Sequence, residues 1–158
     1  MAAPIPLQIR WTQVVVVILA LLQLVVTLLF VNHGPEVAAS WAQRQPELSP
    51  EQVEHAANQT VLGSVIFHAV VAALFAWLAL ILPSGKRWAR LLTTVTLVVG
   101  AIAGYRLLHD SSALIPAEVS GVTIEQIVSM ALRLAALWLL WIPSRVNSFF
   151  ALRTRAST

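Results

Sequence analysis

The sequence predicts an all-α integral membrane protein: a four-helix bundle with both termini in the cytoplasm and one short helix in an outer loop. Three observations support this prediction. The chain is 58% hydrophobic and only 11% charged, whereas soluble domains are about half apolar and about a quarter charged. It contains four long apolar runs, and its acidic and basic residues are segregated along the chain. We therefore expect all 158 residues to form a single transmembrane domain.

Each apolar run is long enough to cross a bilayer, because a helix needs about 20 apolar residues to span a hydrocarbon core of about 30 Å. The predicted spans are 11–31, 61–82, 91–108 and 124–142. The third is the most polar at its outer end, where Tyr105 and Arg106 occur.

The outer loop between the first two spans contains a segment, 35–45, that we expect to form a short helix with Val37 and Trp41 on its apolar side. This helix either rests on the lipid headgroups or provides a docking site for a partner.

Helix ends are signalled locally. Residues 49–52 read Ser-Pro-Glu-Gln, a capping box with proline at the first helical position, and residues 123–126 read Thr-Ile-Glu-Gln, which repeats the box. The second helix should therefore begin near Pro50. Residues 83–85 (Pro-Ser-Gly) and Pro143 should end the second and fourth helices.

The charge distribution predicts the orientation. Seven basic residues fall in the N-terminal tail, the loop between the second and third spans, or the C-terminal tail: Arg10, Lys86, Arg87, Arg90, Arg145, Arg153 and Arg155. All seven acidic residues fall on the other side: Glu36, Glu47, Glu51, Glu54, Asp110, Glu118 and Glu125. Basic loops face the cytoplasm in membrane proteins, so the termini should be cytoplasmic. The pI of about 10.6 would suggest a nucleic-acid partner if the basic residues were spread over a soluble surface. Because the two signs are segregated along the chain, we expect no such partner.

On the cytoplasmic side, Lys86, Arg87, Arg90 and Arg145 are expected to contact anionic lipid. The segment 144–155 mixes apolar residues with arginines, which is typical of an interfacial helix.

A polar layer is expected inside the bundle. Gln23, His68 and Arg133 each lie about eight to ten residues from the outer end of their helix, which is roughly 12 to 15 Å at helical rise. Gln126 and Ser129 precede Arg133 on the same face. In the third helix, Gly100 and Gly104 form a small-xxx-small pattern that favours close helix packing.

Arg133 is the most informative residue of this layer, because arginine at the centre of a membrane helix costs about 2.5 to 3.5 kcal/mol on insertion scales. We find no carboxylate within the predicted hydrocarbon region to pair with it. We expect its side chain to point toward Ser129 and Gln126, with Glu125 next in the same direction. Three interpretations remain open. Arg133 hydrogen-bonds structurally to Gln23, neutral His68 or backbone carbonyls; it binds a lipid phosphate or another anion in an outward cavity; or it contacts an acidic group of a partner protein.

The residue inventory gives no support for an enzyme, a metal site or a cofactor. The chain has no cysteine, a single intramembrane histidine cannot supply two axial haem ligands, and no cluster of His, Asp and Glu suggests a metal site. Ser64 has no positioned base.

The segments 85–90 (GKRWAR) and 143–150 (PSRVNSFF) resemble those of uncharacterised small four-helix membrane proteins of high-GC Gram-positive (actinobacterial) bacteria. The resemblance implies a bacterial inner (cell) membrane location and a noncatalytic role. Our leading hypothesis is an accessory subunit that packs against a larger membrane complex, such as an envelope lipid transporter, and stabilises or regulates it. The alternative is a small lipid- or anion-binding membrane protein that uses Arg133 and His68.

Overall fold

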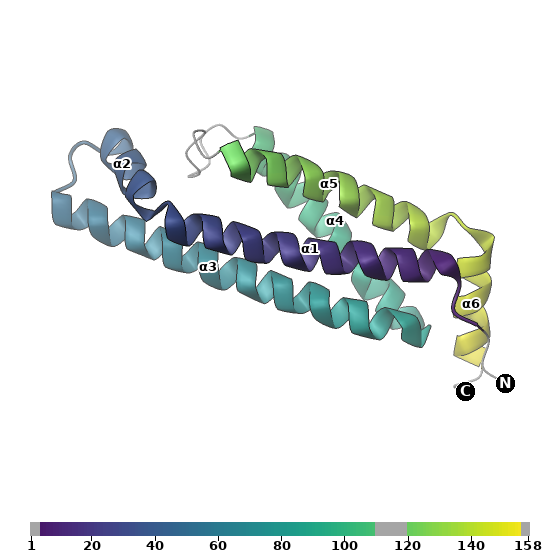
Figure 1. Cartoon of the computed structure of the whole chain (residues 1–158). Helices are drawn as coiled ribbons and strands as arrows, with labels where there is room; N and C mark the ends of the chain where they lie inside the picture. Colours follow the sequence, from purple (N-terminus) through teal and green to yellow (C-terminus); the bar gives the residue numbers. More distant parts are fainter. Residues whose placement is uncertain (1–3, 110–119, 156–158) are drawn as a thin grey trace.

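A computed structural model describes residues 4–109 and 120–155, with only the backbone described at 107–109, 120–123 and 152–155. Within these residues every regular element is helical (Figure 1). The elements in chain order are α1 (Leu7–Asn32), α2 (Gly34–Arg44), α3 (Pro50–Ile81), the 3-10 turn η1 (Leu82–Ser84), α4 (Arg87–His109), α5 (Ser120–Trp141) and α6 (Ser144–Arg155). Asp110 and Glu118, which contributed to the predicted orientation, lie outside the described residues.

The chain is a multi-pass membrane protein. Among the described residues, four helices are long and apolar enough to cross a membrane: Leu7–Asn32, Pro50–Ser84, Arg87–Arg106 and Ile124–Trp141. These segments contain the predicted spans nearly in full, so the prediction of an all-α fold with four membrane-spanning helices is confirmed.

The two ends of the bundle differ in charge. The start of α1, the connection 82–86 and α6 lie together at one end, with α2 and the start of α3 at the other (Figure 1). We call them the basic end, which carries Arg10, Lys86, Arg87 and Arg145, and the acidic end, which carries Glu36, Glu47, Glu51 and Glu54.

The N-terminus of α3 is fixed by its predicted capping box. The hydroxyl of Ser49 accepts a hydrogen bond from the backbone N–H of Gln52 at 3.3 Å, and the side chain of Gln52 accepts one from the N–H of Ser49 at 2.9 Å. Two backbone donors that the helix itself cannot satisfy are thus paired. α3 ends at Ile81 before Pro83, and Gly85 completes the turn with a φ of 70°, a left-handed conformation that favours glycine.

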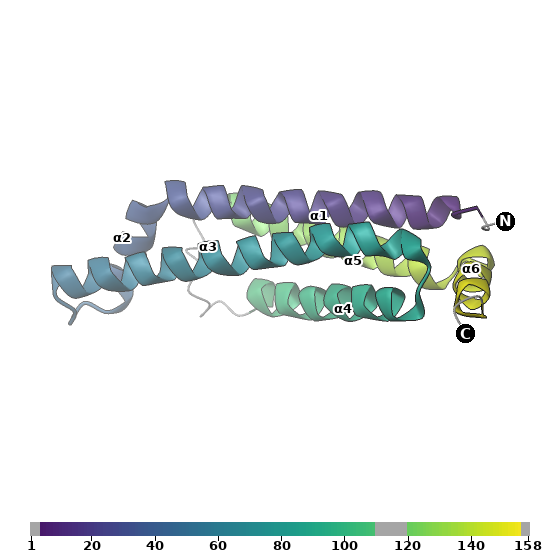
Figure 2. The same ribbon diagram turned by 90° about the horizontal axis from the view of Figure 1, so that it is seen from below.

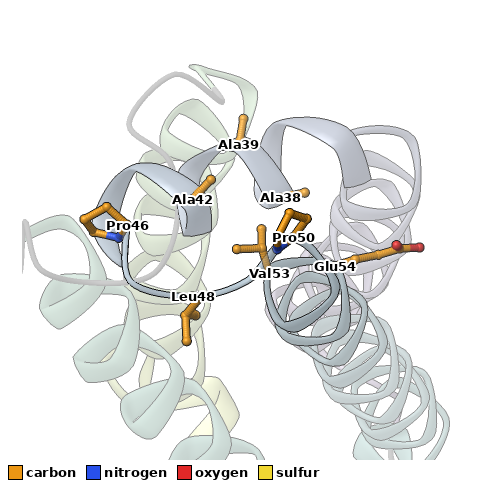
Figure 3. A pocket seen from close by; sticks show the side chains of 8 residues that line it. All are labelled: Ala38, Ala39, Ala42, Pro46, Leu48, Pro50, Val53 and Glu54. Atoms are coloured by element: carbon orange, nitrogen blue, oxygen red, sulfur yellow. The ribbon is translucent and has the colours of Figure 1, made fainter.

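The short outer helix is also present, as α2. Its Val37 is buried, and Trp41 donates a hydrogen bond from Nε1 to the hydroxyl of Thr60 in α3 at 3.1 Å. An open groove of about 490 Å³ lies between α2 and the first turns of α3 (Figure 3).

The order of helices around the bundle leaves one side open. α1 packs along both α3 and α5, and α4 packs along α5, but α3 and α4 make few contacts with each other. These two helices are joined directly at the basic end by η1 (Figure 2). The bundle is therefore closed along three helix pairs and open along the fourth.

The buried apolar core lies toward the basic end. Its largest members include Leu19 of α1, Phe75 and Leu78 of α3, Leu140 of α5 and Phe150 of α6. The core thus holds the helices together in the half near η1, where Arg90 is also buried, and Gln23 lies beyond it toward the acidic end.

Candidate ligand-binding site

Gln23 joins three helices at the centre of the polar layer. Its side chain is only 2% exposed. The amide Nε2 donates to Oε1 of Glu125 in α5 at 3.4 Å, and the amide Oε1 is hydrogen-bonded to Nδ1 of His68 in α3 at 2.7 Å. The structure therefore brings Gln23 and His68, expected at one depth, into direct contact and adds a third residue.

Glu125 has a larger part in the polar layer than the sequence indicated, because it is bonded to Gln23 as well as lying in the direction expected for Arg133. The prediction of a second capping box at 123–126 was wrong, because α5 begins at Ser120 and Thr123 lies within the helix. Glu125 is only 6% exposed and is hydrogen-bonded to Gln23, so the polar layer around Arg133 contains a carboxylate where none was expected. Its spacing of four and eight residues from Ser129 and Arg133 places all three on one helix face, a signal available in the sequence.

Arg133 reaches across to α4. Its Nη1 donates to the backbone carbonyl oxygen of Gly100 at 3.0 Å, and the side chain is 5% exposed. Arg133 also interacts electrostatically with Glu125. The expected direction toward Ser129 and Gln126 stays a prediction, to which the structure adds a hydrogen bond from the guanidinium to the neighbouring helix.

The two glycines of α4 make room for this side chain. A Cβ at Gly100 would lie 3.0 Å from Nε of Arg133, and a Cβ at Gly104 would lie 3.1 Å from Oε1 of Gln126 and 3.4 Å from Nη1 of Arg133. Small residues are often used to bring two helix backbones close. Here they form a slot in α4 that receives a guanidinium and an amide from α5, which we call the glycine slot.

Gln126 and Ser129 are both buried in α5. The hydroxyl of Ser129 donates to the backbone carbonyl of Gln126 at 3.2 Å. Ser129 is thus engaged by its own helix, while Gln126 faces the glycine slot.

A cavity of about 540 Å³ opens next to these groups. It lies where α3 and α4 separate, and side chains from all four spanning helices line it. The apolar part comes mainly from α3 and α4: Phe67, Val71, Leu74, Phe75, Val95 and Val99. The polar part comprises Gln23, His68, Gln126 and Arg133, with Thr60, Ser64 and Thr96 further along the walls.

The imidazole of His68 is held in place by its neighbours. It stacks on Phe30 with ring centroids 5.9 Å apart and meets the edge of Phe67 at 5.3 Å. Its Nε2 has no hydrogen-bond partner among the described residues, and the ring borders the cavity. One polar atom of the layer is thereby left available to a ligand.

No family, curated protein or solved structure matches this chain. The resemblance to actinobacterial membrane proteins therefore stays a prediction. The part of the chain that the structure describes holds no group of three or more His, Cys, Asp or Glu residues placed to bind a metal ion.

At the basic end, Arg90 takes a different position from the other three residues expected to contact anionic lipid. Lys86, Arg87 and Arg145 are exposed, whereas Arg90 is buried. Its Nη2 donates to the carbonyl of Leu140 and to Oδ1 of Asn147, both at 2.6 Å.

The guanidinium of Arg90 also lies 3.9 Å from the ring centre of Trp141 and 5.2 Å from that of Phe150. The guanidinium of Arg90 thus links α4 to the junction of α5 and α6. Contact with lipid headgroups stays a prediction for the exposed residues Lys86, Arg87 and Arg145.

Proposed function

We propose that the chain binds a single-chain membrane amphiphile in the cavity between α3 and α4, with the polar group of the ligand at His68 and Arg133. The observation that carries this proposal is the position of the cavity: it lies in the one open side of the bundle, apolar along its walls and polar at one level.

The route into the cavity favours a membrane ligand over a water-soluble one. Both α3 and α4 are membrane-spanning helices, so an opening between them faces lipid tails. The apolar walls match an acyl chain. A volume of about 540 Å³ falls within the range of ligand sites. It has room for roughly 18 groups the size of a water molecule, which suits one chain and a small headgroup.

The chemistry of Arg133 also supports a ligand. A guanidinium has five N–H donors, and the described hydrogen bonds of Arg133 occupy one of them. Glu125 supplies an opposite charge inside the same layer, so the site does not need a fully charged ligand to balance it. Oxygen acceptors on a ligand headgroup would satisfy further donors of the buried cation.

We further propose that the chain lies in a bacterial inner membrane with its basic end in the cytoplasm, as the positive-inside rule favours. Within this proposal it acts as an accessory subunit that holds lipid for a larger membrane complex. The small extramembrane part of the chain, which is mainly α2 and α6, supports such a role because it leaves little mass for an independent activity.

A matched pair of substitutions tests the ligand site. Val99 lines the cavity, while its neighbour Val98 does not, and both side chains are accessible. Val99→Trp should fill the cavity; Val98→Trp adds the same volume on another face of α4. The full-length protein is purified in mild detergent and analysed by native mass spectrometry. We expect one retained amphiphile on the wild type and on Val98→Trp, and its loss from Val99→Trp. Equal retention by the two variants would contradict the proposal.

A further inference from the structure

The direction of the hydrogen bonds in the polar layer identifies the headgroup that the cavity would take. This inference rests on the proposed function, since it concerns the same cavity. The starting point is Glu125, whose Oε1 receives the hydrogen bond from Gln23. The structure places the amide nitrogen of Gln23 toward Glu125 and the amide oxygen toward His68, the orientation that suits a carboxylate paired with Arg133.

The orientation of Gln23 then determines the tautomer of His68. Because an amide oxygen only accepts, Nδ1 of His68 must carry the hydrogen in the 2.7 Å bond. A neutral imidazole carries one hydrogen on its two ring nitrogens, so Nε2 has a free lone pair. Gln23 and Glu125 therefore act as positioning residues, and what they position is a hydrogen-bond acceptor at the cavity.

Arg133 supplies hydrogen-bond donors at the same cavity as the acceptor Nε2 of His68. A guanidinium donates hydrogen bonds and accepts none. Arg133 borders the same cavity, and its charge acts on His68. The polar end of the cavity thus places the acceptor of His68 beside the donors of Arg133 within a small volume.

We infer that the ligand is a long-chain carboxylic acid. Its O–H donates to Nε2 of His68, and its carbonyl oxygen accepts from the guanidinium of Arg133. If the proton moves to Nε2, the resulting carboxylate and imidazolium keep the same hydrogen bond. A methyl ester or a phosphodiester offers acceptors only and leaves Nε2 unpaired in a buried site, which is costly. The cavity volume also suits one acyl chain better than the two chains of an ordinary phospholipid.

Three probes test the inference on the full-length protein in detergent: palmitic acid, methyl palmitate and a diacyl phosphatidylcholine, whose headgroup has no hydrogen-bond donor. Affinity is measured by displacement of radiolabelled palmitic acid and by direct binding of each labelled probe. For the wild type we expect palmitic acid to bind at least about tenfold more tightly than its methyl ester, because one buried hydrogen bond separates them.

Two variants separate His68 from general effects on the fold. His68→Phe removes the acceptor and keeps an aromatic ring between Phe30 and Phe67. It should lose most of the preference for the acid over the ester, keeping only the part that Arg133 provides. His55→Phe, on the exposed surface of the same helix, is the matched control and should keep the wild-type preference. If His68→Phe does not fold, the preference of the wild type for acid over ester still decides the question.

The outcomes distinguish the two proposals. Equal wild-type affinities for acid and ester, or binding of phosphatidylcholine alone, would overturn the carboxylic acid while leaving the lipid cavity in place. Failure of all three probes to bind would overturn the proposed function itself. If His68→Phe binds the acid over the ester with the same preference as the wild type, His68 does not recognise the headgroup.

Discussion

The glycine slot allows a quantitative test of how Arg133 is accommodated. Gly100→Ala adds one methyl group 3.0 Å from Nε and 3.3 Å from Cζ of Arg133, distances at which the guanidinium must move. Alanine is the better helix former by about 0.8 to 1.0 kcal/mol. Overpacking costs about 1 to 3 kcal/mol. The net expectation is destabilisation by up to roughly 2 kcal/mol, which is about 1 to 3 kcal/mol less favourable than the same substitution at a glycine with open space around it.

Gly63→Ala supplies the reference for this measurement. Gly63 is also within a membrane-spanning helix, but a Cβ there meets nothing within 4 Å. It should report the helix propensity alone and leave stability unchanged or raised by up to about 1 kcal/mol. Thermal unfolding in detergent, followed by circular dichroism, gives both values.

A double-mutant cycle attributes the effect to the guanidinium. In an Arg133→Leu background the slot holds no guanidinium, so the penalty of Gly100→Ala should shrink by at least half if the contact is the cause. If Gly100→Ala is as harmless as Gly63→Ala in the wild type, the guanidinium does not occupy the slot and the reasoning is refuted.

Three further predictions concern other parts of the layer and its orientation. Arg133→Leu should destabilise the protein by about 3 to 5 kcal/mol because it leaves buried Glu125 without its cation, and adding Glu125→Gln should recover most of that loss in the same unfolding assay. Arg90→Met should lower stability by about 1.5 to 3 kcal/mol and speed limited proteolysis within α6, since Arg90 bonds to residues on both sides of the α5–α6 junction; unchanged proteolysis would show that α6 is held by its apolar contacts alone. In intact cells, a cysteine at Ser49 should react with an impermeant maleimide and one at Ser84 should not, and the reverse pattern would invert the proposed orientation.

Much of the helical layout was predictable because hydropathy and capping are local properties. The spans follow from runs of apolar residues, and Ser49 and Gln52 specify the start of α3 through atoms three residues apart. The common depth of Gln23 and His68 could be obtained by counting, since helical rise is constant. Their direct hydrogen bond is a consequence of that depth and of the packing of α1 on α3.

The wrong predictions for Glu125 and Arg90 have the same cause. Glu125 matched a cap by its sequence context, and Arg90 matched a cytoplasmic surface by its position in a basic loop. Both assignments considered position along the helix axis and ignored the face of the helix. The opening between α3 and α4 was also not predictable, because lipid-facing and protein-facing residues are equally apolar in a membrane.

The bond between Arg133 and Gly100 has a consequence for how the chain enters the membrane. α4 and α5 are the two less apolar spans, and α5 carries a buried arginine and a buried glutamate. The acceptor that Arg133 needs belongs to α4, which is synthesised first, and α4 in turn packs mainly on α5. The two helices should therefore enter the bilayer together as a hairpin, with the guanidinium already bonded to the carbonyl. A nascent chain halted after α4 would leave that helix without its principal neighbour and expose it to quality-control proteases.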